Sequence, residues 1–300
     1  MRGRQTRKTN GACLGRGKLE VLTLVLLLAA GSACDRSPSD SPGTASGGDE
    51  VDFGRPVEIP AGLFIYGAGE EEFQLVLAQS RFAYPGIVER LRRMLVMPPR
   101  PVNLPRFYID EFEVTNRQFA AFLDATGYRP EQPRNFLKHW DKGRLPDWSW
   151  DFPVTWVSPT DGEAYCRWRG GRLPTDEEWE KAARGTDGRH FPWGNDLPQV
   201  APPNVGSGKL EPAGNRPGDV SPYGVYDLTG NVAEFTATVV EFEGHRVHTV
   251  RGGSYRGGLG NAFTFARFLG LTPDGREDSV GFRCAYDRLP GDEASAAAGN

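Results

Sequence analysis

The chain has 300 residues, of which 38 are glycine and 24 are proline, and its formal net charge is −4. Glycine and proline together exceed their average share of about 12%, so much of the backbone must form turns and loops. An acidic chain is not expected to bind nucleic acid, and the length suits one large domain or two small ones.

The first 34 residues have the features of an export signal. A basic segment precedes an apolar run from Val21 to Ala30, which is about half the ~20 residues that a membrane-spanning helix needs. The run ends in Gly31-Ser32-Ala33-Cys34, which is similar to the cleavage box of bacterial lipoproteins. We therefore predict a lipoprotein signal peptide over residues 1–33 and lipidation of Cys34. Ordinary secretory cleavage near Ala33 is the alternative.

Lipidation of Cys34 predicts where the chain resides. Buried acyl methylene groups contribute about 0.8 kcal/mol each, enough to hold a protein at a membrane without a spanning helix. We expect the cell envelope, on the periplasmic side, with the membrane as one partner. The sequence does not decide between the inner and the outer membrane.

Processing also changes the charge and the cysteine count. Residues 1–33 carry six basic side chains and one acidic one, a balance of +5, so the chain without them has a net charge of −9. Cys13 leaves with the signal and Cys34 carries the lipid, so Cys166 and Cys284 remain. Two thiols in an oxidising compartment are expected to form a disulfide.

The organisation of the remaining chain follows from composition. Residues 34–50 are rich in Ser, Gly and Pro and are predicted to form a lipidated flexible tether. Residues 51–288 contain no second linker and no repeat, so we predict one domain. Residues 289–300 are predicted to be a disordered tail.

Three segments of this domain combine a helix-capping residue with a glycine stop. They run from Thr115 to Gly127, from Ser158 to Gly170 and from Thr175 to Gly185. Short strands are predicted at Gly62–Tyr66, Arg106–Phe112, His248–Arg251 and Val280–Ala285. This pattern indicates an α+β fold with few regular elements and long loops.

Residues 71–105 depart from this pattern. Apolar residues from Ile87 to Leu95 fall on one helical face, with arginines on the other, and the stiff, polyproline-like sequence PPRP follows. A helix docked on its own domain is the first interpretation. A helix facing a partner or a membrane is the second.

Six ordered sequence blocks resemble one family. They are FYIDEFEVTNRQFAAFL, PVTWVSPTDGEAYCRWRGGRLPTDEEWEKAARG, FPWGND, YGVYDLTGNVAEF, VRGGSY and VGFRCA. In order and spacing they are similar to the formylglycine-generating-enzyme family, also called sulfatase-modifying-factor domains, over about residues 55–288. The resemblance implies a single-domain, heavily looped C-type-lectin-like fold.

The resemblance also implies what is missing. Enzymes of this family oxidise a sulfatase cysteine with copper held by two cysteines, and thiolates are the soft ligands that select Cu(I). Gly257 and Ala262 stand at those two positions, and Ala233 and Phe235 stand where the family's Asn-Val-Trp-Glu-Trp motif has tryptophans, which removes an aromatic wall of the groove. Copper is therefore not expected, and no catalytic residue is assigned.

Other family features are retained. The resemblance implies a disulfide between Cys166 and Cys284. It also implies a structural calcium site built from carboxylate and carbonyl oxygens, for which a capped turn without metal is the alternative. Its residues are Asp227, Gly230, Val232 and Glu234. A second family calcium site would begin at Asn204 and Val205, but its downstream aspartate is not evident.

Three functions remain open. The missing cysteines favour a non-catalytic binding or assembly component, with another envelope protein or a glycan as partner and a groove near Trp148, Ser254 and Tyr255. A metal-dependent oxidoreductase of formylglycine-generating or siderophore-maturation type is the second. A carbohydrate-binding, lectin-like module is the third, since exposed tryptophan rings can stack on sugars. His245 and His248 should point to opposite faces of a strand, so we do not expect them to share a metal.

Overall fold

The computed structural model describes residues 51–80, 85–141, 143–197 and 203–289. The predicted signal peptide, Cys34, the tether and the tail after Leu289 lie outside these ranges. The helices are α1 (Glu70–Ala78), α2 (Pro85–Leu95), α3 (Asn116–Thr126), α4 (Pro159–Trp168) and α5 (Asp176–Arg184), with short 3-10 helices η1 (Asp147–Ser149) and η2 (Leu259–Asn261). The strands are β1 (Val57–Ile59), β2 (Gly62–Ala68), β3 (Met97–Leu104), β4 (Phe107–Ile109), β5 (Ala233–Phe242), β6 (His245–Arg251), β7 (Arg267–Leu269), β8 (Val280–Gly281) and β9 (Ala285–Tyr286).

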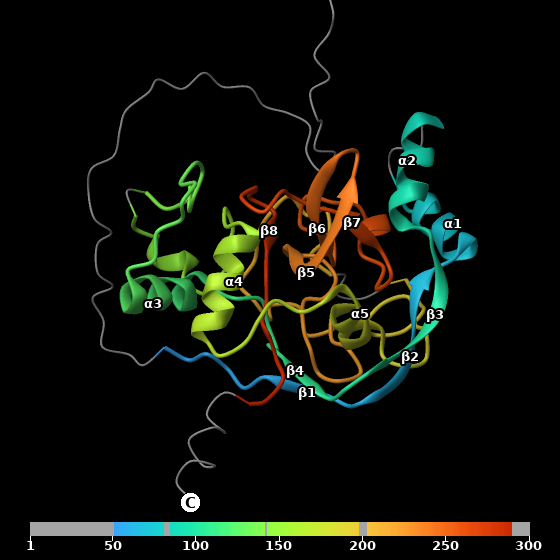
Figure 1. Ribbon diagram of the computed structural model, residues 1–300, viewed down its shortest axis with the longest axis horizontal. Coiled ribbons are helices and arrows are strands. Elements are labelled where there is room, and N and C mark those ends of the chain that lie inside the picture. Colours follow the sequence, from blue (N-terminus) through green and yellow to red (C-terminus); the bar gives the residue numbers. More distant parts are fainter. Residues whose placement is uncertain (1–50, 81–84, 142, 198–202, 290–300) are drawn as a thin grey trace, which may run out of the picture. The chain divides into compact units, whose positions relative to one another are not determined.

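These strands form three small sheets within the described ranges. Their orders are β1-β4-β9, β2-β3 and β7-β6-β5-β8 (Figure 1). The pairs are antiparallel except for β5 and β8, which are parallel. The predicted strand at Val280–Ala285 is therefore two strands. It divides because the chain leaves the sheet of β5 after Gly281 and joins the sheet of β4 at Ala285.

The three predicted helices are confirmed at both ends. Thr115, Ser158 and Thr175 each accept a hydrogen bond from the backbone N–H three residues on, in a complete capping box. Gly127, in a left-handed conformation, ends α3. Such caps satisfy N–H groups that would otherwise lack a partner at the start of a helix.

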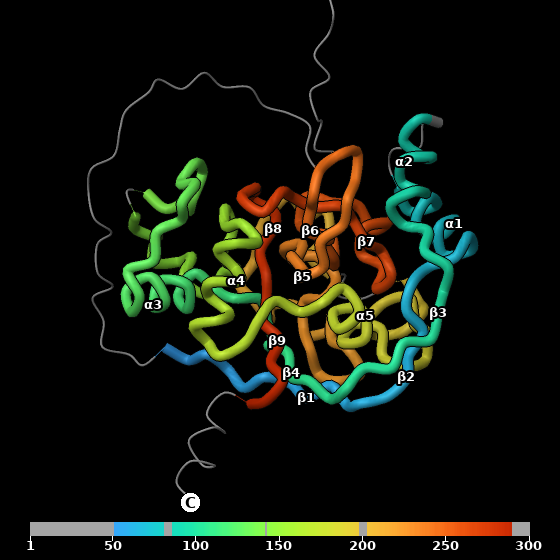
Figure 2. Tube along the Cα trace, viewed as in Figure 1, coloured from blue at the N-terminus to red at the C-terminus, as the bar shows by residue number. Residues whose placement is uncertain are grey.

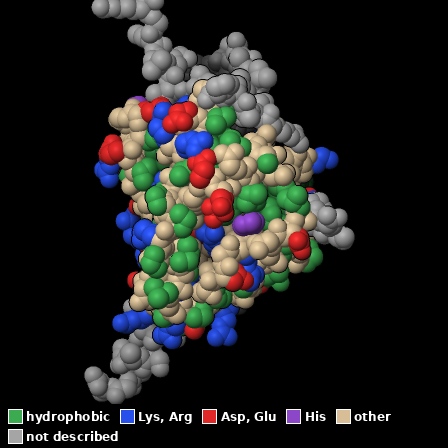
Figure 3. Space-filling model, turned by 90° about the vertical axis from the view of Figure 1, so that its right-hand side faces the viewer, with side chains coloured by type: hydrophobic (Ala, Val, Ile, Leu, Met, Phe, Trp, Pro, Cys, Tyr) green, Lys and Arg blue, Asp and Glu red, His purple; other side chains and the backbone are tan. Residues whose placement is uncertain are grey.

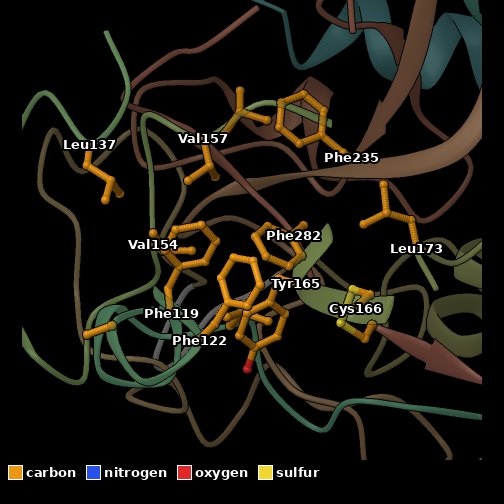
Figure 4. Close-up of a cluster of buried hydrophobic side chains, with 14 of the residues drawn as sticks. Phe119, Phe122, Leu137, Val154, Val157, Tyr165, Cys166, Leu173, Phe235 and Phe282 are labelled. Carbon is orange, nitrogen blue, oxygen red and sulfur yellow. A yellow bond between two sulfur atoms is a disulfide. The ribbon is translucent and has the colours of Figure 1, made fainter. Parts of the chain in front are cut away.

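The largest apolar cluster surrounds the bond between Cys166 and Cys284, whose Cα atoms are 5.5 Å apart, so the predicted disulfide is present. Rings from α3, α4 and the segment after β8 converge beside it (Figure 4). Phe119 stacks on Tyr165 with ring centroids 5.8 Å apart, and Phe282 meets Tyr165 edge-on at 5.5 Å. Burial of these rings places α3 against α4.

Residues 71–105 include the helices α1 and α2 at the tip of a long hairpin and its returning strand β3. β1 and β2 pair with β4 and β3 in one continuous register, from Val57 opposite Ile109 to Tyr66 opposite Arg100. Figure 2 shows this arm running from β1 and β4 to α1 and α2. The PPRP sequence belongs to β3, where Arg100 and Pro101 pair with Tyr66 and Ile65 of β2.

The apolar face of α2 packs on its own domain, as the first interpretation predicted. Ile87 and Leu95 are buried, and Leu91 packs against the apolar cluster that contains Phe73 of α1 and Phe263 of a loop. α5 also fastens the arm. Lys181 Nζ donates to the carbonyl oxygens of Pro60 and Gly62, and Arg184 donates to that of Gly67. Within the described ranges, no helix is long and apolar enough to span a bilayer.

Candidate functional site

The loop at the two copper positions is closed by the hairpin arm. Ala262 is fully buried, and the N–H of Gly257 donates to the Ser254 carbonyl at 2.9 Å. The C-terminal end of α1 lies against η2. A Cβ atom on Gly260 would come within 2.6 Å of Ser80 Oγ and 2.8 Å of the Val76 carbonyl oxygen. Only a glycine permits this approach, so α1 packs directly on the segment between the two positions.

The donor set of this loop does not fit copper. Gly257 and Ala262 offer no side-chain ligand, and Cys166 and Cys284 are joined to each other. Among the residues that the structure describes, no three His, Cys, Asp or Glu side chains come close enough to hold a metal ion. His248 Nδ1 lies 2.8 Å from the Thr236 carbonyl oxygen, whereas His245 is exposed, so the two histidines do not converge.

Glu234, expected as a calcium ligand, is held by an ion pair instead. Its carboxylate is fully buried and accepts hydrogen bonds from Arg283 Nε at 2.8 Å and Nη2 at 2.7 Å. Trp179 Nε1 donates a third bond at 2.8 Å. Arg283 is itself fully buried, so the two side chains form a buried ion pair in which each charge is neutralised by the other.

Asp227 lies in a different environment. One oxygen of its carboxyl group accepts a hydrogen bond from the Gly214 N–H. Its neighbour Glu113 is buried, and both carboxylate oxygens of Glu113 lack a donor among the described residues. Burial and repulsion from Asp227 raise the pKa of Glu113 well above its usual range. Two facing carboxyl groups require a shared proton or a cation.

Asp219 extends this acidic interior. It is buried, its Oδ1 atom has no hydrogen-bond partner in the described part of the chain, and its Oδ2 atom accepts from the Thr229 N–H at 3.0 Å. Burial, and then repulsion from Asp227, raise its pKa. The donor-less oxygens of Glu113 lie beside Asp227, and such a pair of carboxyl groups is suited to a hard cation such as calcium, whereas the oxygens of Glu234 are engaged by Arg283 and Trp179.

The remaining predicted calcium residues serve as loop contacts. Asn204 Nδ2 donates to Asn231 Oδ1 at 3.0 Å, and the Asn204 carbonyl accepts from the Asn231 N–H. The Gly230 N–H donates to the Gly252 carbonyl. Val232 is fully buried, and Val205 is partly exposed. These contacts join the loop of Asn204 to the segment that follows Asp227.

The three residues of the predicted groove differ in exposure. Ser254 and Tyr255 are buried, and the Tyr255 hydroxyl accepts a hydrogen bond from Arg256 Nε at 3.0 Å. Trp148 is 71% exposed, and its ring meets Phe152 edge-on at 5.3 Å. Trp148 is therefore the member of this set that offers a surface to a ligand.

Sequence reasoning missed a second buried charge network. Asp176, the first residue of α5, accepts hydrogen bonds from Arg251 Nε at 2.8 Å and Thr249 Oγ1 at 2.7 Å. Glu180 accepts from Arg251 and from Arg184, both at 3.1 Å. The acidic residues of α5 look solvent-facing in the sequence, and only the packed structure shows that Asp176, Glu178 and Glu180 are buried.

Comparison with known proteins identifies the family. The sequence matches the sulfatase-modifying factor enzyme 1-like domain over residues 45–288. The chain belongs to this family. It is 34% identical over 250 residues to "Inactive C-alpha-formylglycine-generating enzyme 2" of Bos taurus, covering 65% of this chain and 82% of that protein. It is 29% identical over 316 residues to the formylglycine-generating enzyme of Mus musculus, covering 84% and 80%.

The fold of this family member also matches a solved structure. PvdO from Pseudomonas aeruginosa superposes with a TM-score of 0.56 at 22% identity, over 78% of this chain and 94% of that one. At this identity the likeness concerns the fold alone. The predicted family and the predicted single-domain α+β fold are therefore confirmed.

Proposed function

We propose that this chain is a non-catalytic binding or assembly component of the cell envelope. The observation that carries the proposal is the loop from Gly257 to Ala262, which has no thiol and is covered by α1. The described cysteines are both in the disulfide. The relative of Bos taurus named as inactive supports the same reading, because the family includes members described without activity.

A thiol-oxidation assay tests this proposal. The purified chain is incubated with a cysteine-containing peptide, Cu(I) and oxygen, and oxygen uptake is followed with an electrode. We expect uptake no greater than that of copper and peptide without protein. Catalytic turnover above this background would contradict the proposal.

We propose further that a lipid on Cys34 holds the chain at a membrane on the periplasmic side. The support is the basic and apolar segment before Gly31-Ser32-Ala33-Cys34. In a bacterial host the natural chain should fractionate with membranes, and Cys34→Ala should appear in the soluble or secreted fraction. A membrane-bound Cys34→Ala variant would exclude lipid at this residue as the anchor.

A structural calcium ion is part of the proposal, with Asp227 and Glu113 as its carboxylate donors. The support is the pair of donor-less oxygens on Glu113 beside Asp227. Partners other than the membrane would be an envelope protein or a glycan. The exposed ring of Trp148 favours the glycan as a second candidate, since such rings stack on sugars.

A metal-dependent oxidoreductase remains the alternative from another class. It is motivated by the similarity to the formylglycine-generating enzyme of Mus musculus. The oxygen-uptake assay, repeated with Fe(II) in place of Cu(I), distinguishes the two functions directly, because the binding component predicts no metal-dependent uptake.

A further inference from the structure

The ribbon formed by β2 and β3 exposes apolar side chains on its outward face. Successive residues of a strand point to opposite sides of the sheet. Phe64 and Tyr66 of β2 are buried on the inner side. Leu63 and Ile65 alternate with them and are 63% and 45% exposed. Two large aliphatic side chains therefore lie next to each other on a solvent-facing surface, where polar residues are usual.

The outward face continues across β3 without a charge. Pro101 stands opposite Ile65, and Asn103 stands opposite Leu63. Both residues of β3 are exposed. Figure 3 shows the side of the molecule that carries α1, α2 and β3, where apolar side chains lie among basic and acidic ones. The four outward residues form an uncharged, mainly apolar surface, the ribbon patch, and contiguous exposed apolar surface marks contact with a membrane or another protein.

The edges of the ribbon distinguish between these two occupants. α5 covers the outer edge of β2 through Lys181 and Arg184. β3 has no second strand partner in the described part of the chain, and three of its eight residues are Pro98, Pro99 and Pro101. Proline has no backbone N–H, so this edge is poorly suited to pairing with a strand of another protein. Fewer unpaired N–H groups also lower the cost of contact with lipid.

The charge of the ribbon differs from that of the chain. Residues 59–69 and 97–109 contain two charged side chains, Arg100 and Arg106, and no acidic one. Arg100 forms an ion pair with Glu177, and Arg106 is exposed. The chain without residues 1–33 has a net charge of −9, so a bilayer that contains anionic lipids repels most of its surface. The ribbon is a stretch from which this repulsion is absent.

The ribbon also lies close in sequence to the predicted lipid site. β1 starts at Val57, and Leu63 of β2 follows six residues later (63 − 57 = 6). The predicted flexible tether, residues 34–50, has 17 residues, and a flexible chain of that length has an average end-to-end distance of about 20 to 25 Å. A lipid on Cys34 would therefore keep the first strands of the domain at a high local concentration next to the bilayer.

We propose that the ribbon patch contacts the surface of the membrane that holds the lipid of Cys34, with Leu63 and Ile65 inserted among the lipid headgroups. The inference rests on the proposed lipid anchor and adds to it which side of the domain faces the bilayer. Two aliphatic side chains do not hold a protein at a membrane by themselves. Attached by a short tether, they orient the domain, because the second contact is then intramolecular.

Fluorescence quenching by lipid tests this contact on the full, processed and lipidated chain. When Cys34 carries the lipid and Cys166 is bonded to Cys284, Ile65→Cys supplies a single thiol for an environment-sensitive dye. The labelled chain is reconstituted into vesicles of phosphatidylethanolamine and phosphatidylglycerol that contain a spin-labelled lipid. We expect the dye at position 65 to be quenched at least about twofold more than a dye at Asp124→Cys, an exposed position on α3. Equal quenching at the two positions would overturn the proposal.

A second labelled position tests the role of the aliphatic side chains. With the dye at Pro101→Cys, the double substitution Leu63→Glu/Ile65→Glu should reduce quenching by about half or more. Leu75→Glu, at another exposed leucine, should leave quenching unchanged. No loss in the double variant would overturn the proposal, and so would an equal loss with Leu75→Glu, because a general charge effect would then explain both. Thermal unfolding of each variant shows that the fold is kept.

Flotation of the same vesicles separates this inference from the anchor on which it rests. A chain that floats with the vesicles but shows no quenching at position 65 keeps the lipid anchor and loses the ribbon contact. A chain that does not float loses both. A dye that is shielded from iodide in solution but is not quenched by the lipid would indicate a protein partner on the ribbon patch, and would also overturn the proposal.

Discussion

Two buried regions of this domain are stabilised in opposite ways. The cluster around the bond between Cys166 and Cys284 is apolar, and its rings gain from burial whatever their exact partners. The interior around Arg283 is charged. Burial of its charges is tolerated only where each charge has a partner, as the Glu234 carboxylate has in Arg283. Glu113 lacks one among the described residues. A buried group without a hydrogen-bond donor therefore occurs in the charged region and not in the apolar one. We expect a bound cation or proton at such a group.

The largest expected effect belongs to the apolar region. The bridge closes a loop of 118 residues, and the double variant Cys166→Ala/Cys284→Ala should lose about 4 to 5 kcal/mol on the chain-entropy account. Urea unfolding of the oxidised natural chain and of the variant measures this. A loss below about 1 kcal/mol would show that the rings alone hold this region.

Removal of Arg283 should be nearly as damaging in the charged region. Arg283→Met leaves the Glu234 carboxylate buried with only Trp179 as donor, and we expect a loss of about 3 to 5 kcal/mol. The double variant Arg283→Met/Glu234→Gln removes both charges and should recover much of that loss. If the double variant is no more stable than Arg283→Met, the unpaired charge of Glu234 is not the cause of the lost stability.

Asp110 lies between the two regions. Its raised pKa predicts that the stability of the domain depends on pH. Burial raises its pKa to about 6, although Cys284 N–H and the Tyr286 hydroxyl donate to it. Because the folded pKa is above the unfolded value of 3.8, the folded chain binds the proton more tightly, and stability should rise as pH falls from about 6 toward 3.8. The full effect is about 3 kcal/mol.

The comparison that isolates Asp110 is Asp110→Asn, which cannot titrate. The stability of the natural chain relative to this variant should increase on acidification through that range. A difference that stays constant or shrinks on acidification would contradict a raised pKa at Asp110.

A smaller effect tests whether Glu113, whose carboxylate lacks a hydrogen-bond donor among the described residues, binds a cation. Without calcium at neutral pH, Glu113→Gln removes one of two facing carboxylates and should raise stability by about 1 kcal/mol. With calcium, the natural chain should gain more in melting temperature than the variant. Glu131→Gln, at an exposed position, is the control. An equal response to calcium in all three chains would exclude Glu113 as a ligand.

The smallest effect is expected outside both regions. Trp148→Ala should change the free energy of unfolding by no more than about 0.5 kcal/mol, because the ring is largely exposed. If the domain binds sugars through this ring, the same variant should lose retention on a glycan column. Retention that survives the substitution would remove Trp148 from the glycan proposal.

The elements that the sequence predicts well are those with local signals. The capping residues Thr115, Ser158 and Thr175 act within four residues of chain, so α3, α4 and α5 are located at both ends. The sequence of the PPRP segment shows only its local stiffness, whereas its pairing with β2 depends on residues some 35 positions earlier.

The candidate sites depend on contacts that no local signal announces. Glu234 lies in a motif that implies calcium, and only its contact with Arg283 shows that its oxygens are engaged. Likewise, Arg267 looks like an ordinary surface arginine until β7 pairs with β6 and places it opposite Arg251. Buried charges are determined by long-range packing, so sequence periodicity does not reveal them.

Metal content tests the central claim, the absence of redox catalysis, most directly. The full chain is loaded with Cu(I), Fe(II) and Ca²⁺ in turn, passed through a desalting column and analysed by mass spectrometry of the elements. We predict that neither copper nor iron is retained in stoichiometric amount, while calcium is retained by the natural chain and less by Glu113→Gln. One equivalent of copper or iron that survives the column would contradict the claim.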